Sequence, residues 1–139
     1  MSKDTMLEGF RDFQHEVVLM CSLSHENLVK FLGIIDSSPP QMVLEYCERP
    51  DLYKHIKNEN LLPDEIFNDK LKMRFCFDIA KAMKYLHSIP IIHRDLRCPN
   101  VFVVSIDIDA PICLKVGDFG LAQQFSSKLE SILSINFIF

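Results

Sequence analysis

The stretch His93-Arg94-Asp95-Leu96-Arg97-Cys98-Pro99-Asn100 is followed, 23 positions after Asp95, by Asp118-Phe119-Gly120. Two apolar runs, Val101–Val104 and Ile112–Val116, lie between these motifs and predict two short strands. Either motif alone is a weak signal, because strings of three residues arise by chance. Both motifs in this order, with a strand pair between them, form a specific pattern that decides the fold.

The rest of the chain predicts a mixture of helices and strands. Apolar residues recur every three or four positions over residues 6–20 and again over 69–87, which is typical of amphipathic helices. The apolar runs 28–35 and 41–47 are joined by a turn-rich link and predict an antiparallel strand pair. A brief helix is expected from Pro50. The fold class is therefore α+β.

Composition excludes several classes of protein. The 139 residues are 48% hydrophobic with a net charge of −4, which suits one domain and gives no basic face for nucleic acid. The five cysteines are widely spread and include no C-x-x-C pair, which argues against a disulfide scaffold or zinc site and favours a reducing compartment. The start shows no secretory signal, and the apolar end is too short for a transmembrane segment. We expect an intracellular, cytoplasmic protein.

The two motifs match H-R-D-L-x-x-x-N and D-F-G, so the chain resembles a eukaryotic protein kinase. A closer likeness is to the Roco kinases of the tyrosine-kinase-like group, which resemble the leucine-rich-repeat kinases. The runs that carry it are Phe13-Gln14-His15-Glu16-Val17, Pro40–Tyr46, Asp51-Leu52-Tyr53, His93–Asn100 and Ala110–Gly120. This resemblance implies a two-lobe kinase-like fold, and GTPase or leucine-rich-repeat domains in a longer parent protein.

The resemblance also implies catalytic roles. Asp95 would accept or orient the proton of the hydroxyl on a protein substrate, and Arg97 would stabilise the transferring phosphoryl group. Asn100 and Asp118 would hold the Mg²⁺ ions that bridge the phosphates of ATP, since hard oxygen ligands suit a hard cation.

Further roles follow from the same resemblance. Adenine would bond to backbone at Glu45 and Cys47, with Leu44 as the gatekeeper and Phe102 as the floor beneath the base. Met20, Phe31, His93 and Phe119 would stack as a spine. The structural or regulatory set comprises Glu16, Met20, Phe31, His93, Arg94, Phe119 and Gly120. Under any fold, Met20, Phe31 and Phe102 would also be ordinary core residues.

The resemblance implies an incomplete domain. Residues 1–47 correspond to part of the N-lobe, 48–125 to part of the C-lobe, and 126–139 to a tail without family likeness. The Gly-rich phosphate loop, the strand lysine and the A-P-E element are missing from the sequence. Glu16 would lose its lysine partner, and we expect it to turn to solvent or to become protonated.

The favoured interpretation is a protein kinase fragment, acting by family on Ser or Thr with Tyr left open, and inactive alone. A second interpretation is a non-catalytic, truncated kinase-like interaction module that binds a partner through exposed apolar surface. A third is a gene-model fragment, and a fourth is a small-molecule phosphotransferase of kinase-like fold.

Overall fold

The computed structural model describes residues 3–58, 60–63 and 65–124. Its elements are helices and short strands. In chain order they are α1 (Lys3–Ser22), β1 (Phe31–Ile35), β2 (Gln41–Leu44), α2 (Leu52–Lys57), α3 (Asp69–Ser88), β3 (Ile91–Ile92), a 3₁₀ turn (Cys98–Asn100), β4 (Val101–Val103), β5 (Leu114–Val116) and β6 (Gln123–Gln124). The two long helices, the brief helix after Pro50 and the four strands predicted from the sequence are present, and the predicted α+β class is confirmed.

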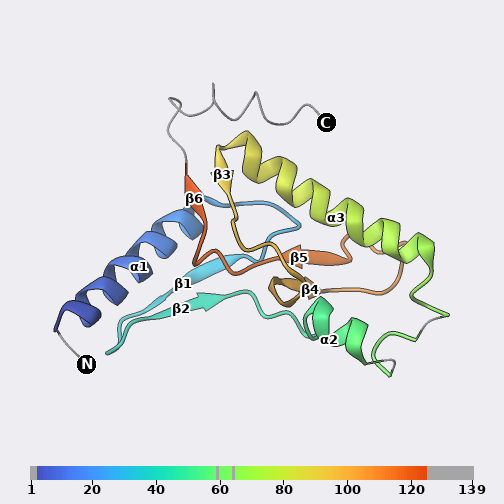
Figure 1. The fold of residues 1–139 in the computed structure, drawn as a ribbon, viewed down its shortest axis with the longest axis horizontal. Coiled ribbons are helices and arrows are strands. Elements are labelled where there is room, and N and C mark those ends of the chain that lie inside the picture. The colour runs from blue at the N-terminus through green and yellow to red at the C-terminus, as the bar shows by residue number, and fades with distance from the viewer. Residues whose placement is uncertain (1–2, 59, 64, 125–139) are drawn as a thin grey trace.

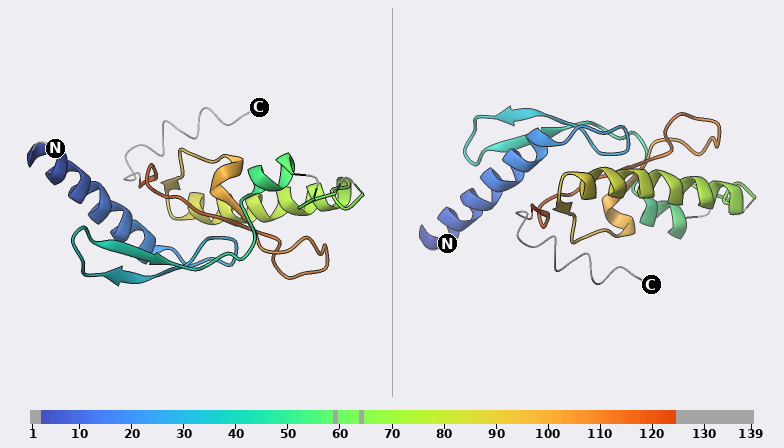
Figure 2. Two further views of the ribbon diagram at one scale, coloured as in Figure 1. Left: turned by 90° about the horizontal axis from the view of Figure 1, so that it is seen from below. Right: turned by 90° about the horizontal axis from the view of Figure 1, so that it is seen from above.

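The strands form three small antiparallel sheets within the described residues: β1 with β2, β3 with β6, and β4 with β5. Figure 1 shows β1 and β2 beside α1, while β4 and β5 lie between that hairpin and α3. Seen from two further sides in Figure 2, α1 with β1–β2 occupies one end of the molecule and α3 with α2 the other. The β4–β5 hairpin therefore lies at the junction of the two ends.

The predicted strand over 28–35 is divided in the structure. Leu28 forms an isolated parallel bridge with Val116 of β5, and the strand proper begins only at Phe31. The amide N–H of Val29 donates to the carbonyl of Val116 at 2.8 Å, and that of Val116 donates to Asn27 at 2.8 Å. The start of the run thus joins the two ends of the molecule instead of extending β1.

Helix α3 begins where its side-chain cap allows. The Asn68 side chain accepts hydrogen bonds from the backbone of Lys70 and Leu71, both at 3.1 Å, which satisfies two free N–H groups of the first turn. One face of the helix is buried against β5 and β3 and carries Leu71, Phe75, Asp78, Ala82 and Leu86. This packing fixes β5, and with it the segment that follows β5.

Other apolar side chains stay exposed. Leu32 and Ile34 of β1 expose 57% and 56% of their surface, and Met73 and Phe77 of α3 expose 69% and 58%. No helix in the described part of the chain is long and apolar enough to cross a membrane.

Candidate active site

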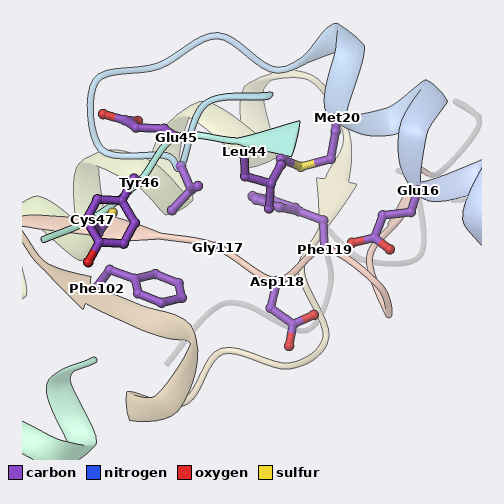
Figure 3. Close-up of a pocket in the computed structure, with 11 residues that line it drawn as sticks. Glu16, Met20, Leu44, Glu45, Tyr46, Cys47, Phe102, Gly117, Asp118 and Phe119 are labelled. Carbon is purple, nitrogen blue, oxygen red and sulfur yellow. The ribbon is translucent and has the colours of Figure 1, made fainter. Parts of the chain in front are cut away.

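A pocket of about 420 Å³ lies where α1, the end of β2, β4 and β5 meet. All five residues that the sequence analysis assigned to ATP line it. They are Leu44, Glu45, Cys47, Phe102 and Asp118. Three residues of the structural set, Glu16, Met20 and Phe119, line it as well (Figure 3). Residues from positions 16 to 119 are thus brought to one cavity.

Sequence reasoning missed three residues of the lining, namely Val29, Tyr46 and Gly117. A Cβ at Gly117 would lie 2.9 Å from Phe102 Cε2 and 2.9 Å from Val29 Cγ2, so the ring and the valine close tightly on bare backbone. The position of Gly117 directly before Asp118 was an available signal for it. Nothing in the sequence marked Val29, because its place depends on the bridge between Leu28 and Val116.

Asp95, Arg97 and Asn100 form a second cluster beside the pocket. The Asn100 side-chain N–H₂ donates to the Asp95 backbone oxygen at 2.9 Å and to Asp95 Oδ2 at 2.8 Å. Arg97 Nε donates to the same carboxylate oxygen at 3.1 Å. Both donors of the Asn100 amide are thereby turned to Asp95, and the amide oxygen remains to accept a hydrogen bond or to bind a cation.

Backbone groups of Gly117 connect this cluster to the pocket. The Gly117 N–H donates to the Asn100 carbonyl at 2.9 Å, and the Gly117 carbonyl lies 3.0 Å from His93 Nε2. The His93 ring packs against Phe119, with centroids 5.0 Å apart. Asp118 follows with a φ of 62°, a left-handed conformation that is rare for residues other than glycine. The hydrogen bonds of Gly117 before it and the packing of Phe119 on His93 after it hold Asp118 at the pocket.

Two other members of the structural set lie outside the pocket lining. Phe31, in β1, is partly buried against the core. Arg94 has a φ of 63° and donates to the Leu121 carbonyl and, at 2.8 Å, to Gln123 Oε1. Arg94 therefore engages the chain just after Asp118-Phe119-Gly120.

Glu16 remains half-buried at the pocket and does not turn fully to solvent. Burial, and secondarily the charge of Asp118, raise its pKa above the ordinary value. Among the described residues, no Lys or Arg lines this pocket and no ion pair involves Glu16. Burial and Asp118 therefore disfavour the charged form of Glu16, and the side chain does not turn fully to solvent.

Glu45 has a strong partner that sequence reasoning did not find. Lys115 of β5 donates to both of its carboxylate oxygens, at 2.6 and 2.7 Å, and the Lys115 side chain is only 12% exposed. Burial alone would raise the pKa of Glu45, but the hydrogen bonds from Lys115 and from the Lys30 backbone lower it overall. The Glu45 N–H already donates to the Lys30 carbonyl at 2.8 Å, so Glu45 is held through its backbone as well as through its side-chain contact with Lys115.

Comparisons with known proteins agree with this geometry. A family model described as protein tyrosine and serine/threonine kinase matches residues 1–135, which extends past residue 125, where we expected the family likeness to end. The probable serine/threonine-protein kinase qkgA of Dictyostelium discoideum is 41% identical over 133 residues, covering 94% of this chain and 8% of that protein. The probable serine/threonine-protein kinase roco11 of the same organism is 40% identical over 134 residues, covering 95% and 9%.

A plant relative extends the comparison. The serine/threonine-protein kinase VIK of Arabidopsis thaliana is 43% identical over 117 residues, covering 81% of this chain and 25% of that protein. The chain spans less than a tenth of the first two relatives. The predicted likeness to Roco kinases of the tyrosine-kinase-like group and the kinase-like fold are both confirmed. The chain belongs to the protein tyrosine and serine/threonine kinase family.

Proposed function

We propose that this chain carries the nucleotide pocket and catalytic loop of a kinase domain that transfers the γ-phosphate of ATP to protein Ser or Thr hydroxyls. The observation that carries the proposal is the link through Gly117, whose N–H and carbonyl reach Asn100 and His93 while its Cα borders the pocket. Through Asn100, which donates to Asp95, such a link would hold the proposed catalytic base beside the proposed nucleotide site. Phosphoryl transfer needs mainly this kind of positioning.

We assign adenine to the end of the pocket formed by Glu45, Cys47 and Phe102. The backbone of Glu45 and Cys47 would bond to the edge of the base, Phe102 would lie beneath it, and Leu44 would act as the gatekeeper. The ion pair between Glu45 and Lys115 supports this assignment, because it holds in place the backbone that would bond to adenine.

The donor set supports Mg²⁺ as the metal. The amide oxygen of Asn100 and the carboxylate of Asp118 are hard ligands, and a bound Mg²⁺ would supply positive charge against the phosphates. The described residues contain no group of three or more His, Cys, Asp or Glu that could hold a metal, so phosphate oxygens would complete the coordination. Asp95 would take or orient the substrate proton, and Arg97 would lie ready to stabilise the transferred group.

The remaining assignments concern conformation. The spine of the active arrangement would be formed by Met20, Phe31, His93 and Phe119. The ring contact between His93 and Phe119 supports this part of the spine. Arg94 would stabilise one conformation of the chain after Gly120, to which it is already hydrogen-bonded.

We further propose residues 1–47 as part of an N-lobe and 48–125 as part of a C-lobe within a longer protein that contains GTPase or leucine-rich-repeat domains. The Roco relative and its much greater length support this context. All five cysteines lie in the described residues and are free thiols, which supports a reducing, cytoplasmic location.

The isolated 139-residue chain is expected to show no useful kinase activity, because no basic side chain among the described residues faces the pocket to hold phosphate. The test uses the endogenous protein, tagged at its locus as wild-type and Asp95→Asn alleles, alongside the purified chain. With radiolabelled ATP and Mg²⁺, the endogenous wild type should label Ser and Thr in a protein substrate, and the variant should not. Equal labelling by both alleles would refute the proposal for the domain. Asp95-dependent labelling by the purified chain would refute its inactivity alone.

A non-catalytic interaction module is the second candidate, favoured by the exposed apolar side chains of β1 and α3. It predicts that both alleles lack transferase activity and that a partner is lost when Leu32 and Phe77 are replaced by Lys.

A further inference from the structure

We propose that Asp78 is a positioning residue for phosphoryl transfer: it sets the register of β5 against β4, and thereby the spacing of Asn100 and Asp118, the two candidate ligands of Mg²⁺. This role rests on the proposed kinase function and extends it to a residue of α3 that lies outside the pocket lining and the catalytic loop. Asp78 acts only through the backbone of β5.

The two candidate ligands lie at the same end of one hairpin. Asn100 directly precedes β4, and Asp118 follows β5 after a single residue. The adjoining strand residues, Val101 and Val116, are partners in the register. Because strand residues rise about 3.4 Å each and alternate in face, the smallest slip that keeps the same faces buried moves β5 by about 7 Å. A misplacement of only about 1 Å can already cost about a hundredfold in rate.

The connection between the two strands does not fix this register by itself. Each strand has three residues, and the ten residues 104–113 join Val103 to Leu114. Val104 donates to the Cys113 carbonyl at 2.7 Å, which extends the pairing by one residue only. A two-residue turn dictates how its strands pair, whereas a connection of this length allows several pairings. The register therefore depends on contacts from outside the hairpin.

Asp78 supplies such a contact from α3, which lies beside β5 (Figure 1). Its Oδ2 accepts hydrogen bonds from the backbone N–H groups of Cys113 at 2.7 Å and Leu114 at 3.1 Å, and the side chain is fully buried. The carbonyl of Leu114 accepts a bond at 2.9 Å from the side chain of Asn27, which is also fully buried. The first residue of β5 is thus held through both of its backbone groups.

Asp78 opposes the slip that the apolar pattern would allow. Moving β5 by two residues in one direction would put Asp118 at the buried position of Val116, so burial alone opposes this slip. The opposite slip brings apolar residues to the buried positions of β5. In that register Pro111 would take the place of Cys113, and proline has no N–H to donate. Asp78 can accept two hydrogen bonds only in the observed pairing.

Arg74, one turn earlier on α3, holds the segment that leads into β5. Its side chain donates to the carbonyls of Ala110 at 3.0 Å and Pro111 at 2.8 Å. Its Nε lies 3.4 Å from Asp78 Oδ1, so its charge balances that of the buried carboxylate. Together the two side chains hold the backbone of residues 110–114 against one face of the helix.

The experiment uses the endogenous protein, tagged at its locus and purified as wild type, Asp78→Leu, Asp78→Asn and Leu71→Ala. Leucine accepts no hydrogen bond, whereas asparagine keeps one oxygen for both N–H groups. Leu71→Ala is the matched control. Leu71 is buried on the same face of α3 and has no polar side-chain atom, so its substitution lowers stability alone.

The first measurement is the rate of phosphorylation of a protein substrate over a series of Mg²⁺ concentrations. Asp78→Leu should raise the Mg²⁺ concentration for half-maximal rate by about tenfold or more and lower kcat, with KM for the protein substrate within about twofold. Asp78→Asn should stay within about threefold of wild type. Leu71→Ala should lower the apparent kcat through its folded fraction and leave the Mg²⁺ dependence unchanged.

The second measurement needs neither metal nor activity. It is hydrogen exchange in chelator at the Gly117 N–H, which donates to the Asn100 carbonyl in the observed register. Relative to the amides of α3, exchange at Gly117 should become about tenfold faster or more in Asp78→Leu. It should keep its relative rate in Leu71→Ala, because general destabilisation speeds both sets of amides together.

Should Asp78→Leu match Leu71→Ala in both measurements, Asp78 has a structural role only, and the inference is wrong while the kinase function stands. Should the wild type show no Asp95-dependent labelling, the proposed function fails, and the exchange at Gly117 still decides whether Asp78 sets the register. Should Asp78→Leu not fold, Arg74→Met takes its place, because it releases the carbonyls before β5. A response of Arg74→Met equal to that of Leu71→Ala would then overturn the inference.

Discussion

At the scale of single residues, burial and the nearby charge of Asp118 disfavour the charged form of Glu16. Its folded-state pKa lies above its ordinary value of 4.5, so the folded chain binds more protons than the unfolded chain above that pH. Stability from this group is therefore full below pH 4.5 and is lost as pH rises through the raised pKa.

Glu16→Gln should consequently stabilise the chain at pH 7.5, and its advantage should shrink as pH falls toward 4.5. Urea midpoints for variant and wild type across this range measure the difference. An advantage for Glu16→Gln that grows toward acid would contradict the assigned cause.

Glu45 differs from Glu16, because its charged form is stabilised by Lys115. Lys115→Met should destabilise the chain by about 1–3 kcal/mol, because it leaves a half-buried carboxylate without its two hydrogen bonds. The exposed pair of Lys72 and Asp69, at 3.5 Å, offers the control, and Lys72→Met should cost less than about 0.5 kcal/mol. Chemical denaturation measures both. Equal losses would show that burial of the Lys115 pair contributes nothing.

At the scale of elements, α3 depends on its cap. Asn68→Ala removes two hydrogen bonds to free N–H groups and should cost about 1 kcal/mol, with fraying of the first turn. Asn60→Ala is the control, since Asn60 contributes only its backbone N–H to a hydrogen bond. Urea unfolding followed by circular dichroism measures both. A loss at position 60 as large as that at position 68 would refute the role of the cap.

The amphipathic pattern of α3 did not predict that this helix packs on β5. Asp78 is fully buried and accepts hydrogen bonds from the backbone of Cys113 at 2.7 Å and Leu114 at 3.1 Å. Arg74 donates to the carbonyls of Ala110 and Pro111. In sequence, both look like ordinary polar positions of an amphipathic helix. Their role as anchors for β5 arises because β5 packs against this face.

At the scale of the whole molecule, apolar surface is exposed at both ends. Leu32→Lys with Phe77→Lys should reduce concentration-dependent self-association and change the urea midpoint little, because neither side chain is buried. Light scattering after size exclusion measures the association. Ser37→Lys, also at an exposed position, separates the effect of added charge from that of removed apolar surface. Unchanged association in the double variant would show that these faces do not drive it.

The sequence by itself determined the family, the α+β class and the residues around which the pocket is built. The class follows from helical periodicity and β-branched runs, whereas the family and the pocket residues follow from the resemblance carried by two motifs whose spacing is specific.

Tertiary structure alone decided what faces these residues. Val29 reaches the pocket only because Leu28 bridges to Val116. The negative charge of Glu45 is balanced only because Lys115 lies across from it. Both contacts join residues about 70 or more positions apart, as their sequence numbers show. Local periodicity carries no information on such pairs, because they are fixed by how the two ends of the molecule pack on β5.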